Sequence, residues 1–277
     1  MARFFAFGCS FTSWNWPTWA DFYARNFNYY ENWGHAGLGN RAIAERVAEC
    51  NIKNKFTQDD TVIVQWSSHL RHDYMLFDKD NKETWQTKGS LFSYQNKDVF
   101  NDDWKKKFFD EKAYFLSNLN SILLTAGLLK STGCNFMFTS INNLETLGTD
   151  IPHQKEQGEN LRNTPELANA WDEYGLQEYK YIFDEDYWLE PVGLYAWFRQ
   201  DYSWSFRDKD GNKWIELHPS PIQHLNWVMD NLSHNLDQHQ QIMIDNINNV
   251  KTDDYKETIK NITNLKIEGW DRTYRGY

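Results

Sequence analysis

The sequence is poor in cysteine and proline, and it has no long apolar run. Its 277 residues include only three cysteines and six prolines. Cys9, Cys50 and Cys134 are odd in number, widely spaced and without a Cys-x-x-Cys motif. Such a set disfavours a disulfide framework or a zinc site and fits a reducing compartment. The longest apolar stretch, around Ile122–Leu129, is too short to cross a bilayer.

The start of the sequence also lacks the features of a signal peptide. Met1-Ala2-Arg3 leads directly into Phe4–Phe7, which is too short for the apolar core of a secretory signal. We therefore expect a soluble protein of the cytoplasm, without a membrane partner.

Basic residues are scarce relative to acidic ones. The chain has 29 Lys and Arg against 39 Asp and Glu, for a net charge of −10. A general nucleic-acid binder needs a basic face that neutralises phosphates. The one basic cluster, Lys105–Lys107, stands among acidic residues and predicts a solvated helix face. We therefore expect no nucleic-acid partner.

Aromatic residues, by contrast, are abundant. The 14 Trp, 15 Tyr and 18 Phe make up 17% of the chain. Bulky core packing explains such a content, and so does a surface on which sugar rings or a partner protein stack. Both interpretations stay open on the sequence alone.

Short apolar runs alternate with segments of helical periodicity in the first half of the chain. The runs predict buried strands at Arg3–Phe7, Asn28–Asn32, Thr61–Trp66 and Asn135–Thr139. The periodic segments predict helices at Thr18–Arg25 with Pro17 in its first turn, from an N-cap at Asn40 to Cys50, and at Asp102–Ser131. This alternation predicts a three-layer α/β/α sandwich around a parallel sheet.

The rest of the chain departs from this rhythm. Ser67–Phe100 is polar, and we expect it to be irregular. Residues 142–212 are rich in Trp and Pro and predict an insertion over one edge of the sheet. A helix is expected from Ser220-Pro221 to about Leu236, and residues 245–277 form a C-terminal extension that docks on the body or on a partner protein. The whole chain, 1–277, is expected to be one α/β domain.

Three motifs carry the candidate chemistry. The first is Gly8-Cys9-Ser10-Phe11, which directly follows the first predicted strand. A serine at the carboxyl end of a parallel strand lies at the edge where open α/β sheets bind ligands. A serine hydroxyl becomes a good nucleophile only when a base takes its proton. A plain turn or cap is the alternative role for Ser10.

The second motif is the glycine-rich segment from Asn32 to Asn40, between a strand and a helix. Its glycines Gly34, Gly37 and Gly39 allow a tight turn that points backbone N–H groups outward. Such N–H groups suit an oxyanion hole. An ordinary strand-to-helix turn is the alternative.

The third motif is Glu216-Leu217-His218-Pro219, which precedes a predicted helix late in the chain. A histidine with a nearby acid forms a base and its orienting carboxylate, as in a serine triad. His218 stands late enough in the chain to close such a triad with Ser10.

Together, these motifs resemble the SGNH/GDSL serine hydrolase family, whose fold is a flavodoxin-like α/β/α sandwich. The closest pattern is its Gly-Cys-Ser-Phe subgroup, which is common in bacteriophages and bacteria. The resemblance implies that Ser10 is the nucleophile, with its own N–H in the oxyanion hole. It also implies that Gly37, five residues after Asn32, contributes its N–H to the same oxyanion hole, and that His218 is the base.

The chain departs from the family pattern at three places. Cys9 replaces the aspartate of the first block, which the subgroup tolerates. The third block lacks its asparagine and reads Gln65-Trp66-Ser67-Ser68-His69-Leu70-Arg71, so Ser68, His69 or Arg71 would rebuild the oxyanion hole. The acid, Glu216, stands two residues before the histidine, where the family usually places aspartate at three.

The function that these residues predict is hydrolysis of an ester, with an O-acetyl or similar acyl group on a carbohydrate as the favoured substrate. No cofactor and no metal is implied, and the acidic run Asp184–Asp186 is interpreted as a solvated loop. The alternative is a catalytically weak or inactive SGNH scaffold that serves as a phage structural or accessory binding protein. A virion-associated location goes with that alternative.

Overall fold

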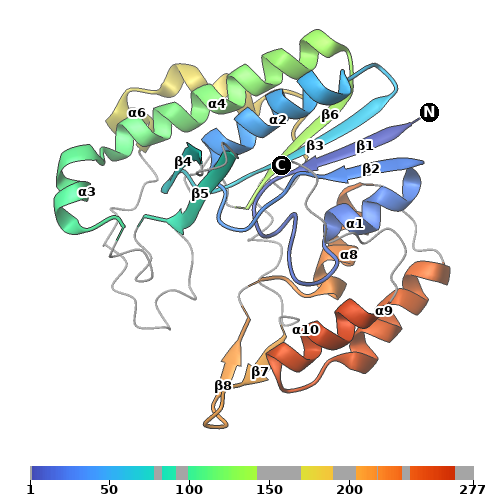
Figure 1. The fold of residues 1–277 in the computed structure, drawn as a ribbon. Coiled ribbons are helices and arrows are strands. Elements are labelled where there is room, and N and C mark those ends of the chain that lie inside the picture. The colour runs from blue at the N-terminus through green and yellow to red at the C-terminus, as the bar shows by residue number, and fades with distance from the viewer. Residues whose placement is uncertain are drawn as a thin grey trace.

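The computed structural model describes residues 2–77, 83–91, 99–141, 170–189, 204–216, 218–232 and 238–265. Its centre is a four-stranded parallel sheet in the order β2-β1-β3-β6 (Figure 1). The strands are β1 (Arg3–Phe7), β2 (Tyr29–Asn32), β3 (Asp60–Trp66) and β6 (Asn135–Ser140). All four strands expected from the apolar runs are confirmed, with ends that differ by at most one residue.

Helices cover both faces of this sheet, which confirms the three-layer α/β/α architecture. On one face, α2 (Asn40–Asn54) and α4 (Glu111–Thr132) lie side by side, and on the other α1 (Trp19–Tyr23) packs against α8 (Pro221–Asn231) (Figure 1). Adjacent residues of β1 face opposite layers. Phe4 makes an edge-to-face contact with Trp19 of α1, whereas Phe5 contacts Phe56, which lies just after α2. Burial on both faces explains why Phe4–Phe7 of β1 form an unbroken apolar run.

Three local expectations about helices are wrong. The segment predicted as one helix is two, α3 (Asp102–Phe108) and α4, because Asp110 accepts a hydrogen bond from Ala113 N and starts a new helix. Asn40 is not an N-cap but the first residue of α2, whose N-cap is Gly39. Pro17 lies before α1, which is capped by Thr18.

The segment after β3 is more regular than expected. It contains the antiparallel hairpin of β4 (Arg71–Phe77) and β5 (Glu83–Ser90). Arg71 pairs with Ser90 but Asp73 pairs with Thr87, so β5 carries one extra residue at this point, which is a bulge in β5.

The later part of the chain is described only in pieces, since much of the expected insertion and the end of the C-terminal extension fall outside the described residues. The described pieces are α6 (Ala170–Tyr174), the 3₁₀ helix η4 (Gln177–Phe183), β7 (Ser205–Arg207), β8 (Lys213–Ile215), α9 (Gln238–Val250) and α10 (Tyr255–Asn264). Trp188 forms a parallel bridge with Phe138 of β6, so the chain at Trp188 continues the sheet at its edge. Within the described residues, no helix is both long and apolar enough to cross a membrane.

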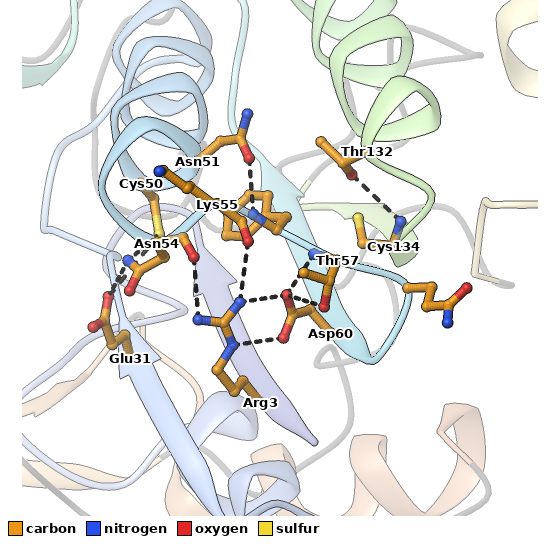
Figure 2. A network of polar contacts seen from close by, with 12 residues as sticks. Arg3, Glu31, Cys50, Asn51, Asn54, Lys55, Thr57, Asp60, Thr132 and Cys134 are labelled. Atoms are coloured by element: carbon orange, nitrogen blue, oxygen red, sulfur yellow. Dashed lines mark hydrogen bonds and ion pairs between the residues drawn. The ribbon is translucent and has the colours of Figure 1, made fainter. Parts of the chain in front are cut away.

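An ion pair fastens the amino ends of the two central strands (Figure 2). Arg3 Nε donates to Asp60 Oδ1 at 2.7 Å, and Arg3 Nη2 donates to Asp60 Oδ2 at 2.6 Å. Thr57 N and Oγ1 also donate to Asp60 Oδ2, at 2.6 and 3.1 Å. Burial alone would raise the pKa of Asp60, but the hydrogen bonds from Arg3 and Thr57 hold that pKa below its usual range.

The same guanidinium closes the carboxyl end of α2. Arg3 Nη1 donates to the carbonyl of Asn54 and Nη2 to that of Lys55, at 3.2 and 3.3 Å. Lys55 ends the helix in a left-handed conformation with φ of 50°. A cation at a helix C-terminus is favourable because the last carbonyls there have no intrahelical partner. This amino edge of the sheet therefore serves stability, and the candidate chemistry lies at the opposite edge.

Candidate active site

Ser10 lies on the loop that leaves the carboxyl end of β1, between β2 and β3. Gly8 makes this loop possible, because a Cβ at Gly8 would overlap Thr12 Oγ1 and meet Gln65 Cβ at 3.0 Å. Thr12 Oγ1 donates to Gln65 Oε1 at 2.8 Å and so ties the loop to the end of β3. Ser10 itself is only 7% exposed. The residue expected to be the nucleophile thus sits at the edge of the sheet, on a loop with little freedom.

His218 is held by the acid that the sequence paired with it. Its Nδ1 lies 2.7 Å from Glu216 Oε1, and the same oxygen accepts the backbone N–H of His218 at 3.2 Å. A carboxylate only accepts hydrogen bonds, so Nδ1 carries the proton and the lone pair of the neutral ring is on Nε2. Glu216 is buried, and its backbone N–H donates to the carbonyl of Trp204 at 2.9 Å.

Aromatic contacts bring His218 to the Ser10 loop. Trp14 stacks on the imidazole and Phe11, the neighbour of Ser10, meets it edge-on with 5.7 Å between ring centroids. Trp16 Nε1 donates to the carbonyl of Pro219 at 2.8 Å. Within the described part of the chain no hydrogen bond joins Ser10 to His218. The structure therefore places the two motifs against each other without closing the contact between their side chains.

The glycine-rich second loop is tied to the Ser10 loop. Asn32 Nδ2 donates to the carbonyl of Thr12 at 2.8 Å, while Asn32 Oδ1 accepts the N–H of Gly34 at 2.9 Å. His35 N donates to the carbonyl of Gly8 at 3.1 Å. Gly37 adopts a φ of 84°, which L-residues with side chains rarely take up. The oxyanion candidate Gly37 therefore belongs to a loop held beside the candidate nucleophile.

Asn40, which was expected to be an N-cap, fixes the third loop, the segment Ser67–Leu70 that follows β3. Asn40 Oδ1 accepts the N–H of Ser67 at 2.6 Å and Asn40 Nδ2 donates to its carbonyl at 2.9 Å. The same amide donates to Asn118 Oδ1 of α4 at 2.6 Å. Asn40 directly follows Gly39 in the sequence, but no sequence pattern indicates that it contacts Ser67.

The oxyanion candidates of the third loop have different surroundings. Ser68 Oγ accepts the N–H of Leu70 at 3.2 Å. His69 is buried against α4, with Nε2 at 3.7 Å from Glu111 Oε1 and its ring edge on Phe115. Arg71 Nη1 donates to the carbonyl of Leu38 in the second loop at 2.8 Å. Of these residues, Arg71 is the one whose side chain binds the glycine-rich loop.

A second histidine lies behind the first. His224 of α8 is fully buried, and burial together with the nearby charge of His218 lowers its pKa to about 3. His224 is therefore neutral near pH 7. One histidine on an amphipathic helix carries no signal of its own, so His224 was not among the residues expected at the site.

The described residues around this site include neither a cluster of metal ligands nor an exposed thiol. Across the described ranges, no three His, Cys, Asp or Glu side chains gather as metal ligands would. The three cysteines are buried and unpaired, including Cys9 beside Ser10.

Comparison with known proteins adds no family assignment. No protein-family model matches the chain, and no curated protein matches it.

Proposed function

We propose that the protein is an SGNH-type serine ester hydrolase. The observation that supports this most directly is the Glu216–His218 pair, because it leaves Nε2 as the basic ring nitrogen while Trp14 and Phe11 hold the ring at the Ser10 loop. A base oriented by a buried acid, close to a serine at a strand end, is the arrangement that nucleophilic acyl transfer needs.

The reaction follows from these positions. Ser10 Oγ attacks the acyl carbon and its proton passes to His218 Nε2. The N–H groups of Ser10 and Gly37 stabilise the negative oxygen that forms. Collapse of this intermediate releases the alcohol, which takes the proton from Nε2. Water then attacks the acyl-enzyme, Nε2 accepts a proton from it, and Ser10 recovers a proton as the acid leaves.

The substrate class we propose is an acylated carbohydrate, with an O-acetyl ester as the first compound to test. The support is Trp14, whose indole is partly exposed beside His218, whereas its neighbours Trp16 and Trp204 are buried and serve to hold it in place. Flat aromatic rings suit the apolar faces of sugars.

The test is covalent labelling of Ser10 with a fluorophosphonate, together with turnover of p-nitrophenyl acetate and of an O-acetylated glycan. Wild-type protein is expected to label and to turn over, and Ser10→Ala to do neither. Ser13→Ala is the matched control, since Ser13 lies on the same loop. Loss of turnover on removing a triad serine is on the order of 10⁴-fold or more.

The second candidate is an inactive scaffold that binds a partner protein. Two observations favour it: Ser10 is 7% exposed, and no hydrogen bond links it to His218 among the described residues. If wild-type protein neither labels nor exceeds Ser10→Ala in turnover on any of these esters, the scaffold replaces the hydrolase.

A further inference from the structure

We propose that Asp73 is a positioning residue, which fastens the loop carrying Gly37 to the β4–β5 hairpin and so sets where the Gly37 N–H points. The inference rests on the proposed hydrolase function, because Gly37 matters as an oxyanion donor only in that reaction. The hairpin, in a segment expected from the sequence to be irregular, would thus have a role at the site.

Three sets of hydrogen bonds join the hairpin to consecutive residues of the loop. Gly89 N of β5 donates to the carbonyl of Gly37 at 3.2 Å. Arg71 Nη1 of β4 donates to the carbonyl of Leu38 at 2.8 Å. Gly39 N donates to both carboxylate oxygens of Asp73, at 3.0 and 2.9 Å. The hairpin thus holds each residue from 37 to 39 by a separate contact.

Asp73 also takes the place of a helix cap. Gly39 is the N-cap of α2 and has no side chain with which to cap it. The carboxylate of Asp73 reaches this N-terminus from a different element and accepts the Gly39 N–H, which a negative group does favourably. Asp73 is 4% exposed, and burial raises its pKa to about 6 against the lowering effect of the Gly39 hydrogen bond. At pH 8 it is therefore a buried, charged group that holds the loop.

The fit between hairpin and loop depends on the absence of a side chain at Gly39. A Cβ there would lie 2.5 Å from Asp73 Oδ2 and 2.9 Å from Arg71 Cβ. The backbone of Gly39 has a φ of −94°, which any residue adopts, so alanine would leave the local torsions intact. Gly39→Ala therefore pushes the hairpin away from the loop without breaking the loop itself.

The kinetic test compares Asp73→Asn with the exposed control Asp245→Asn at pH 8. A misplaced oxyanion donor weakens binding of the transition state and leaves ground-state binding alone. We expect kcat for p-nitrophenyl acetate to fall roughly 10- to 100-fold in Asp73→Asn, with KM within about twofold. The control should match wild type. Equal kcat in Asp73→Asn and wild type, or a rise in KM alone, would overturn the proposal.

Gly39→Ala covers the case in which Asp73→Asn does not fold. It is expected to lower kcat by a similar factor, and the double variant should lose little more than either single variant, because both disturb one contact. Full additivity of the two losses would mean that they act through different structures and would count against the proposal.

Amide hydrogen exchange separates this inference from the proposed function. In Asp73→Asn, the amides of Gly39 and Gly89, which donate across the contact between hairpin and loop, are expected to exchange at least about 10-fold faster, whereas those of β1 stay protected. If wild-type protein has no Ser10-dependent activity, the proposed function fails, and this exchange still decides whether the hairpin holds the loop. Unchanged exchange at both glycines overturns the positioning role.

Discussion

The indole of Trp14 lies nearly parallel to the imidazole of His218, with 3.5 Å between ring centroids and 17° between the planes. Glu216 holds the same ring through Nδ1 at 2.7 Å. Trp14 therefore fixes the plane of the imidazole, and Glu216 fixes the rotation of the ring within that plane. A rotation that kept the stacking would break the hydrogen bond, so the two contacts together decide which nitrogen faces the Ser10 loop.

The first prediction concerns this stacking. Trp14→Leu should lower kcat/KM for p-nitrophenyl acetate about 3- to 10-fold, because an aromatic pair contributes roughly 0.5–1.5 kcal/mol beyond its buried area. Trp14→Phe keeps a flat ring and should retain most of the activity. Trp214→Leu, in the partly exposed β8, is the control. If Trp14→Leu and Trp214→Leu behave alike, the stacking has no role in orienting the base.

The second prediction concerns the acid. Glu216→Gln should lower kcat on the order of 10²- to 10⁴-fold, because a neutral amide neither fixes the Nδ1–H tautomer nor stabilises the imidazolium. The fold should persist, which circular dichroism and the unfolding midpoint will check. The exposed Glu178→Gln serves as the control. A variant with wild-type kcat would remove Glu216 from the mechanism and leave His218 without its orienting group.

The third prediction concerns the opposite edge of the sheet. Arg3→Met leaves the buried Asp60 without its cation and should cost about 3 kcal/mol of unfolding free energy at pH 7. The folded-state pKa of Asp60 is depressed, so the contribution of the pair is present above about pH 4 and is lost as the pH falls through the folded value. The cost of the substitution should therefore shrink at pH 3, as measured by urea denaturation.

The control for this substitution is Lys53→Met. Lys53 pairs with Glu49 one turn away on the exposed face of α2, where such pairs contribute less than about 1 kcal/mol. Below its unfolding midpoint, Arg3→Met should still label at Ser10 with the wild-type rate. An equal loss of stability in both variants, or slower labelling, would contradict a purely structural role for Arg3.

The fourth prediction concerns a buried carboxyl group in α1. Burial raises the pKa of Asp21 to about 7, although Thr18 N donates to it at 2.7 Å. The folded protein thus binds a proton more tightly than the unfolded chain, and stability should fall as the pH rises from about 4 to 7, by about 4 kcal/mol from this group. In Asp21→Asn that loss should disappear. Urea denaturation of both proteins at pH 5 and pH 8 measures the difference.

His224 has the opposite pH dependence, which is why the comparison uses a difference between two proteins. Its lowered pKa means that the unfolded chain binds the proton more tightly, so its contribution decreases stability as the pH falls below about 6.5. This effect is common to wild type and Asp21→Asn and cancels between them. A difference that does not change between pH 5 and pH 8 would show that Asp21 is ionised at both.

The central strands were predictable because buried strands have a recognisable apolar sequence. Strands covered on both faces are mostly apolar, as the runs Phe4–Phe7 and Val62–Val64 show. The break before α4 was missed because the apolar periodicity continues through Phe108 and Phe109, and only Asp110 signals a new start. A continuous apolar periodicity is a stronger signal for one helix than a single capping residue is for two.

The contacts that organise the candidate site were less predictable, because they join residues far apart in the chain. Asn40 and Asp73 both show this. Each is polar and buried, and each bonds the backbone of another loop: Ser67 for Asn40 and Gly39 for Asp73. Propensity rules assign such residues to caps or to the surface. Their partners emerge only when the sheet has brought the loops together.

The burial of all three cysteines gives the molecule a surface free of thiols, since the chain contains no others. Thiol reagents such as maleimides react with exposed thiolates and should leave the folded protein unmodified. One cysteine introduced on the β4–β5 hairpin would then carry a fluorescent dye at that single position. Its emission would report in real time whether the hairpin leaves the glycine-rich loop.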